Sequence, residues 1–183
     1  MLLAIALSLA GHAAEQSDLA LTRDAFAGLC GNLTSETAVM ATGETNGWVA
    51  VAPDPKRAIG SYYAMAASWG PWKGTAFHAY RKLVAGHTMD ALVFNVANSQ
   101  VIGAGLHCIV YMDDGRTENP VDVIRWGKTE PRLTPEPAGG RLLQWRDPGV
   151  FATHAITTVE LAPPSGAGIE IWSIGVLSAA TKN

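Results

Sequence analysis

Mostly apolar residues recur every three or four positions between residues 17 and 33, and this spacing predicts an amphipathic helix there. Ser17 is a suitable N-cap, Asp18 suits the positive end of the helix dipole, and Gly31 can end the helix. The predicted inner face carries Leu19, Thr22, Phe26, Leu29, Cys30 and Leu33. Cys30 is therefore expected near the C-terminal end of the apolar face.

A shorter helix and a strand are expected next. Thr34 or Ser35 can cap the second helix, Glu36 suits its first turn, and Gly43 is a typical stop. After an Asn-Gly turn, the apolar run Trp48–Val51 predicts a strand, and the Pro-Asp-Pro segment that follows ends it.

The pattern changes to a strand-like one in the middle of the chain. Residues 60–74 are rich in Gly, Ala and aromatic side chains and fit neither period, so an irregular loop or a short helix is expected. Three β-like runs follow, and the segments between them are suitable connections. The simplest topology is an antiparallel meander of residues 75–84, 89–97 and 105–112.

The last third of the chain reads as a short helix and several strands. A helix is expected over 119–127, with Asn at its cap and Pro at its first position, and a Pro-rich linker over 130–140. Residues 142–146 predict a strand, and 155–162 with 168–177 predict a β-hairpin. The sum is an α+β fold, with N-terminal helices packed on a largely antiparallel β-sheet that includes a C-terminal β-hairpin.

The start of the chain has the pattern of a secretory signal. Leu2–Ala10 is apolar apart from one serine and is too short to span a bilayer, which needs roughly 20 residues. Gly11 and Ala13 suit the small-residue positions before a cut, so 1–13 is predicted to be a cleaved signal segment and 14–183 a single domain. The run lacks a preceding Lys or Arg, which leaves a first buried helix as the alternative.

Composition narrows the class of protein. Hydrophobic residues make up 48% of the 183 residues and charged residues 16%, which is enough for a sizeable core. The formal net charge is −3 and no Lys/Arg cluster is present, so nucleic acid is not an expected partner. No later apolar run has the length of a transmembrane segment. The signal segment therefore predicts a periplasmic or secreted location.

The chain has two cysteines, Cys30 and Cys108. In an exported protein an even count suggests a disulfide, and two cysteines allow one intramolecular pairing. The alternative is a pair of buried, unreactive thiols. We predict the disulfide, on the condition that the compartment is oxidising.

The string YMDD, Tyr111–Asp114, resembles the metal-binding signature of reverse transcriptases. Such a site needs a further carboxylate and subdomains that hold template and nucleotide, and this chain is too short to supply them. Asp-Gly after an apolar strand is a strong turn signal. We interpret the string as a turn.

No histidine belongs to a local metal or nucleophile motif. His107 adjoins Cys108, but adjacent residues on a strand point to opposite faces, so the two are not expected to interact. The alternative is a nonlocal site, in which a histidine meets a carboxylate in a cleft. The residues considered for it are His78, His87, His107, His154, Asp90, Asp113 and Asp114.

Six tryptophans are many for a chain of this size. Trp48 and Trp172 lie on apolar strands and are expected in the core. Trp69, Trp72 and Lys73 lie in a turn-rich stretch, where indole rings could form a surface that binds a sugar, a peptide or a quaternary amine. The alternative is that these two tryptophans also fill the core.

The layout of the chain resembles that of small, uncharacterised exported bacterial proteins. The similarity rests on a Phe-x-x-x-Cys helix (Phe26, Cys30), a Gly-Trp pair (Gly47, Trp48) and one cysteine on a central strand (Cys108). It implies a periplasmic or secreted helix-plus-sheet domain and carries over no catalytic residue.

These observations favour an exported, non-enzymatic binding or interaction module whose partner is an envelope protein or a glycan. No catalytic residue, metal ligand or cofactor is predicted. One alternative is a hydrolase-type enzyme with a nonlocal His/Asp site, and another is an accessory subunit of an envelope complex.

Overall fold

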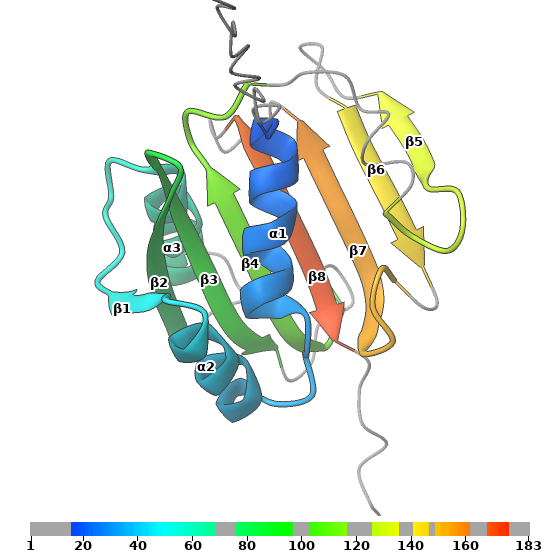
Figure 1. Cartoon of the computed structure of the whole chain (residues 1–183). Coiled ribbons are helices and arrows are strands. Elements are labelled where there is room, and N and C mark those ends of the chain that lie inside the picture. The colour runs from blue at the N-terminus through cyan, green and yellow to red at the C-terminus, as the bar shows by residue number, and fades with distance from the viewer. Residues whose placement is uncertain are drawn as a thin grey trace, which may run out of the picture.

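The computed structural model describes residues 16–68, 76–96, 103–116, 126–135, 141–146, 149–161 and 168–175. These residues form an eight-stranded antiparallel sheet of order β1-β2-β3-β4-β8-β7-β6-β5 (Figure 1). The strands are β1 Val49–Val51, β2 Phe77–Val84, β3 His87–Val96, β4 Gly105–Met112, β5 Arg132–Pro135, β6 Arg141–Arg146, β7 His154–Leu161 and β8 Ile169–Gly175. The predicted α+β class is confirmed.

The helices that the structure describes lie on both faces of the sheet. They are α1 Asp18–Cys30, α2 Glu36–Thr45 and α3 Ala58–Ser68. α1 crosses the middle of the sheet over β4 and β8, with α2 beside it, and α3 lies on the opposite face (Figure 1). Two apolar cores result: one under α1 and α2, and a smaller one where Ile59 of α3 packs with Leu92 and Phe94 of β3.

The predicted limits of α1 are confirmed. The Ser17 side chain accepts a hydrogen bond from the backbone N–H of Ala20 at 3.3 Å, and Gly31 is the C-cap. Phe26 and Leu29 on its inner face are fully buried. Burying a side chain of this size stabilises the fold by about 2 kcal/mol, so this face holds the helix on the sheet.

The prediction that Gly43 ends the second helix is wrong. α2 continues to Thr45, with Asn46 as its C-cap, and Gly43 is buried within it. A Cβ added at Gly43 would lie 2.6 Å from Cδ1 of Leu29. The glycine therefore allows α1 and α2 to approach each other, and the chain needs it for packing and not for termination.

The predicted meander of β2, β3 and β4 is confirmed. The turn between β2 and β3 is shorter than expected, because only Ala85 and Gly86 form it, with φ of 50° and 88°. Two residues at positive φ suit a tight hairpin whose twist matches that of the strands. His87 and Thr88, which were assigned to the turn, consequently belong to β3.

The C-terminal strands β6, β7 and β8 are as predicted, with β7 and β8 antiparallel neighbours. The Pro-rich segment 130–140 is not only a linker, because it contains the edge strand β5. Proline is tolerated at a sheet edge, where its missing N–H need not pair. Within 60–74, α3 extends to Ser68 and the rest lies outside the described residues, as does most of the helix predicted at 119–127.

No helix within the described ranges is both long enough and apolar enough to cross a membrane.

Candidate functional site

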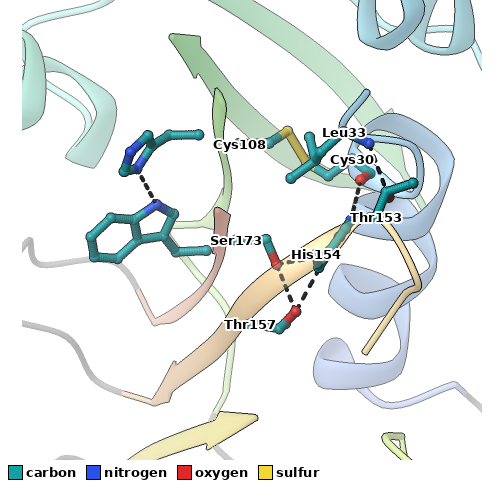
Figure 2. The surroundings of a disulfide bond; sticks show 9 residues. Cys30, Leu33, Cys108, Thr153, His154, Thr157 and Ser173 are labelled. Atoms are coloured by element: carbon teal, nitrogen blue, oxygen red, sulfur yellow. Dashed lines mark hydrogen bonds between the residues drawn. A yellow bond between two sulfur atoms is a disulfide. The ribbon is translucent and has the colours of Figure 1, made fainter. Parts of the chain in front are cut away.

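The two cysteines form a disulfide bond, as predicted. Cys30 is the last residue of α1 and Cys108 lies in the middle of β4, with Cα atoms 5.8 Å apart (Figure 2). Both residues are fully buried. Cys108 belongs to the same core as Val110 and Met112, as strand alternation predicts. The bond joins the first helix to the centre of the sheet.

His154, the first residue of β7, lies beside the disulfide (Figure 2). Its Nε2–H donates to the backbone oxygen of Cys30 at 2.8 Å. Its Nδ1 lies 2.9 Å from Oγ of Ser173 and 3.3 Å from Oγ1 of Thr157, and the two hydroxyl oxygens are 2.8 Å apart. Burial lowers the pKa of His154 to about 4, and the bond to Cys30 opposes this only in part. The imidazole is therefore neutral at pH 7.

A serine next to a histidine is a feature of nucleophilic catalysis. Here Ser173, His154 and Thr157 have no exposed surface, so no substrate reaches the hydroxyl groups. The imidazole also donates to a backbone oxygen, and this oxygen belongs to the last turn of α1, where helix carbonyls lack partners within the helix. The cluster therefore stabilises the end of α1 and the surroundings of the disulfide.

Two half-buried histidines, His78 and His87, pair with carboxylates at the surface. His87 lies 3.2 Å from Asp114 through Nδ1 and 3.6 Å from Asp18 through Nε2, and His78 lies 3.7 Å from Glu36. The His87–Asp114 pair meets the distance expected of a His/Asp site. The Asp114 side chain is 64% exposed, however, and neither residue lines the pocket described below.

The two aspartates of the YMDD string contact different cations. Asp113 lies 3.4 Å from Arg57, whereas Asp114 faces His87. The N–H of Gly115 bonds back to the last residue of β4 at 3.3 Å, which closes a turn. The interpretation of Asp113 and Asp114 as a turn is confirmed, and the two carboxylates face different partners.

Asp90 is the fully buried carboxylate of β3. It forms ion pairs with Arg57, the residue before α3, and with Arg81 on β2, whose Nε lies 2.7 Å from Oδ1. Arg57 also donates to the backbone oxygen of Thr88 at 3.1 Å. This cluster joins the start of α3 to the β2–β3 hairpin. Within the described ranges, no three His, Cys, Asp or Glu residues are placed to hold a metal ion.

A pocket of about 240 Å³ lies on the α3 face of the sheet, over β6, β7 and β8. Its floor consists of two cross-strand rows, because residues paired across antiparallel strands share a face. The described residues that line it are Gln144, Thr158 and Trp172 in one row, Arg146, Ile156 and Ile174 in the next, and Gly103 before β4. We call this site the Trp172 pocket.

His107 forms hydrogen bonds with two residues that line the Trp172 pocket. Its Nδ1 accepts the indole N–H of Trp172 at 3.1 Å, and its Nε2 donates to the backbone oxygen of Gly103 at 3.1 Å. The ring also stacks on Phe94, with centroids 4.9 Å apart. Burial lowers the pKa of His107 to about 4, although the bond to Gly103 raises it. Because only the neutral ring can both donate and accept, His107 holds two lining residues in place.

The polar side of the pocket lies on β6. Nε of Arg146 donates to Oε1 of Gln144 at 2.7 Å, and Nε2 of Gln144 lies 3.4 Å from Oγ1 of Thr158. Among the described lining residues, Arg146 is the only one with a charged side chain. The guanidinium, amide and hydroxyl groups therefore supply several hydrogen-bond donors along this side of the pocket.

Sequence reasoning missed this pocket. Trp48 is buried as predicted. Trp172, which is expected in the core, is half-buried: it packs against the smaller core and also lines the pocket. Alternation along β6 does place Gln144 and Arg146 on one face, which was an available signal. The predicted surface of Trp69, Trp72 and Lys73 lies outside the described residues.

Comparisons of the chain with protein-family models, with curated proteins and with solved structures found no match.

Proposed function

We propose that this protein is an exported, non-enzymatic binding protein that holds a small ligand in the Trp172 pocket. The observation that carries the proposal is the composition of the pocket floor: an indole and two isoleucine side chains beside a short polar edge. Ligand sites commonly combine an apolar lining with a few polar groups that orient the ligand. The volume of about 240 Å³ suits a ligand with one or two rings.

The hydrogen bonds around the pocket also favour binding. A site binds well when its walls already have the bound geometry, because less conformational entropy is then lost. His107 donates to Gly103 and accepts from Trp172, which holds these two residues of the lining in place, and the bond from Arg146 orients Gln144. The ligand would therefore meet a preformed surface.

The accessory-subunit alternative has less support. It calls for a large apolar interface, and contiguous exposed apolar area is the usual sign of one. The large apolar side chains that are exposed in the described residues come from α2, β1, α3, β2 and β5, at both ends of the sheet. Because these side chains are spread over both ends of the sheet, they do not indicate one large interface. They are Met40, Val49, Tyr63, Leu83 and Leu133.

Export is supported by the disulfide, since such bonds persist mainly in oxidising compartments. Expression of the full chain in a Gram-negative host, with intact-mass measurement of the periplasmic fraction, tests this part. The expected product begins at Ala14 and has both cysteines oxidised. Unprocessed protein in the cytoplasm with two free thiols would contradict it.

Binding is tested by NMR titration of the indole N–H signal of Trp172, assigned by its loss in Trp172→Phe. The probes are 3-phenylpropanoate and its neutral amide. At least one probe should shift this signal in a saturable way. Ile156→Trp, which fills the pocket, should abolish the binding, whereas Leu133→Trp, which adds the same ring at a 61% exposed site on β5, should not.

The proposal fails if neither probe shifts the signal. It also fails if both probes bind Ile156→Trp as well as they bind the unmodified protein.

A further inference from the structure

Arg146 is the charged residue among the described lining of the Trp172 pocket, and one of its five N–H donors is already used. Nε donates to Gln144 Oε1 at 2.7 Å, while Gln144 in turn lies 3.4 Å from the Thr158 hydroxyl. The two terminal nitrogens of the guanidinium keep their four N–H groups for another acceptor. A carboxylate matches such a fork with two parallel hydrogen bonds.

The charge of Arg146 is not neutralised within the described part of the chain. The ion pairs there engage Arg23, Arg57 and Arg81, and none includes Arg146. Arg57 and Arg81 both bind Asp90, so their positive charge is compensated. Arg146 therefore offers an uncompensated positive charge at the edge of an apolar floor.

A second guanidinium lies on the same face. Arg132 on β5 is the Cα partner of Gln144, so both side chains project toward the side of the pocket. Arg132 also forms no ion pair within the described ranges. Two arginines on either side of one glutamine attract an anion to this edge, although the whole chain carries a net charge of −3.

The spacing of the strands sets the size of the ligand. Arg146 is on β6, its partner Ile156 is on β7, and Trp172 is on β8. Neighbouring strands lie about 4.8 Å apart, so the strands that carry the guanidinium and the indole are separated by about 10 Å. An anion on β6 and a flat ring on β8 fit one molecule of that length.

We propose, on the basis of the function proposed above, that the ligand of the Trp172 pocket is a small monocarboxylate with a flat apolar ring. Its carboxylate binds the terminal nitrogens of Arg146, which Gln144 aligns, and its ring lies against Trp172. The chemical class is that of arylalkanoic acids.

The matched probes 3-phenylpropanoate and 3-phenylpropanamide differ only in the group that Arg146 would bind. Their dissociation constants are measured from the indole N–H shift of Trp172 in the full chain. The carboxylate should bind about tenfold more tightly than the amide, which corresponds to about 1.4 kcal/mol. Raising the salt concentration should reduce this preference, because screening weakens exposed charge pairs.

Arg146→Gln should abolish the preference and leave the binding of the amide unchanged. The matched control is Arg141→Gln, which removes an arginine from the same strand. Arg141 is an odd number of residues from Arg146 and Gln144, so it projects to the other face, and this variant should keep the full preference.

Two results separate this inference from the function it rests on. Equal binding of both probes, blocked by Ile156→Trp, would overturn the carboxylate inference and leave the pocket as a binding site. Undiminished carboxylate preference in Arg146→Gln would also overturn it. Failure of both probes to bind would overturn the proposed function itself.

Discussion

Trp172 on β8 donates its indole N–H to Nδ1 of His107 on β4, at a distance of 3.1 Å. The other ring nitrogen of His107 donates to Gly103, so the imidazole is used fully in its neutral form. Gly103 and Trp172 both line the pocket. A buried histidine therefore links two of its walls, and its protonation would break one of these links.

Stability should fall between pH 6.5 and pH 4. Burial lowers the pKa of His107 and of His154 to about 4, from 6.5 in the unfolded chain. In this range the unfolded chain binds protons that the folded protein does not, so the free energy of unfolding decreases as pH falls. Each histidine contributes about 3 kcal/mol over the range.

Urea unfolding of the unmodified protein and of His107→Phe at several pH values checks this. The phenyl ring keeps the stacking on Phe94 but does not titrate. Between pH 7 and pH 4 the difference in unfolding free energy should therefore shift by about 3 kcal/mol in favour of the variant. A difference that does not depend on pH would contradict the prediction.

Removing the disulfide should destabilise the protein strongly. The bond closes a loop with a sequence separation of 78, and restoring the freedom of that loop in the unfolded chain costs about 4 kcal/mol. The variant Cys30→Ala/Cys108→Ala removes both thiols together and so leaves none free to react. In guanidinium unfolding, the denaturant concentration at the midpoint should fall by the amount that corresponds to this loss in the free energy of unfolding. An unchanged midpoint would mean that the bond adds no stability.

The hydroxyl of Thr157 should be important for the His154 cluster. It accepts the backbone N–H of Val150 at 3.1 Å and lies within hydrogen-bond reach of His154. Thr157→Val keeps the shape and leaves these buried groups without that partner, which should cost about 2 kcal/mol in thermal or urea unfolding. The same change at the exposed Thr45 should cost roughly 0.5 kcal/mol or less. Equal effects at the two sites would contradict the role of the cluster.

Asp90 should be a much more sensitive position than an exposed aspartate. Its side chain is fully buried between Arg57 and Arg81, which are themselves partly exposed. Asp90→Asn removes the charge that both arginines share and should cost about 2 kcal/mol, below the usual cost for a fully buried pair. Asp24→Asn is the control, because the Asp24–Arg23 pair is exposed and should contribute roughly 0.5 kcal/mol or less. Urea unfolding of both variants measures the difference.

Local pattern was enough to predict most individual elements. The hydroxyl of Ser17 and the glycine at position 31 set the limits of α1 as expected. Alternation on β4 placed Cys108 in the core under α1 and His107 on the opposite face. These features depend on neighbours within a few residues, so they can be recognised without knowing the rest of the fold.

The exceptions have a common cause in long-range packing. Gly43 lies within α2 and not at its end, and Leu29 of another helix occupies the space that a side chain at position 43 would need. The segment around Arg132 forms β5 because β6 is available as a pairing partner. Strand pairing of this kind depends on the whole sheet, and composition alone indicated only a linker.

By itself, the sequence determined the α+β class, the faces of the strands and the two cysteines that could pair. Tertiary structure alone decided that β8 lies between β4 and β7, which places Trp172 within reach of His107 and aligns it with Thr158 and Gln144. The physical reason is that side-chain periodicity reports only on interactions along one strand. The pocket is formed by residues of several strands, and the order of those strands depends on burying both faces of the sheet at once.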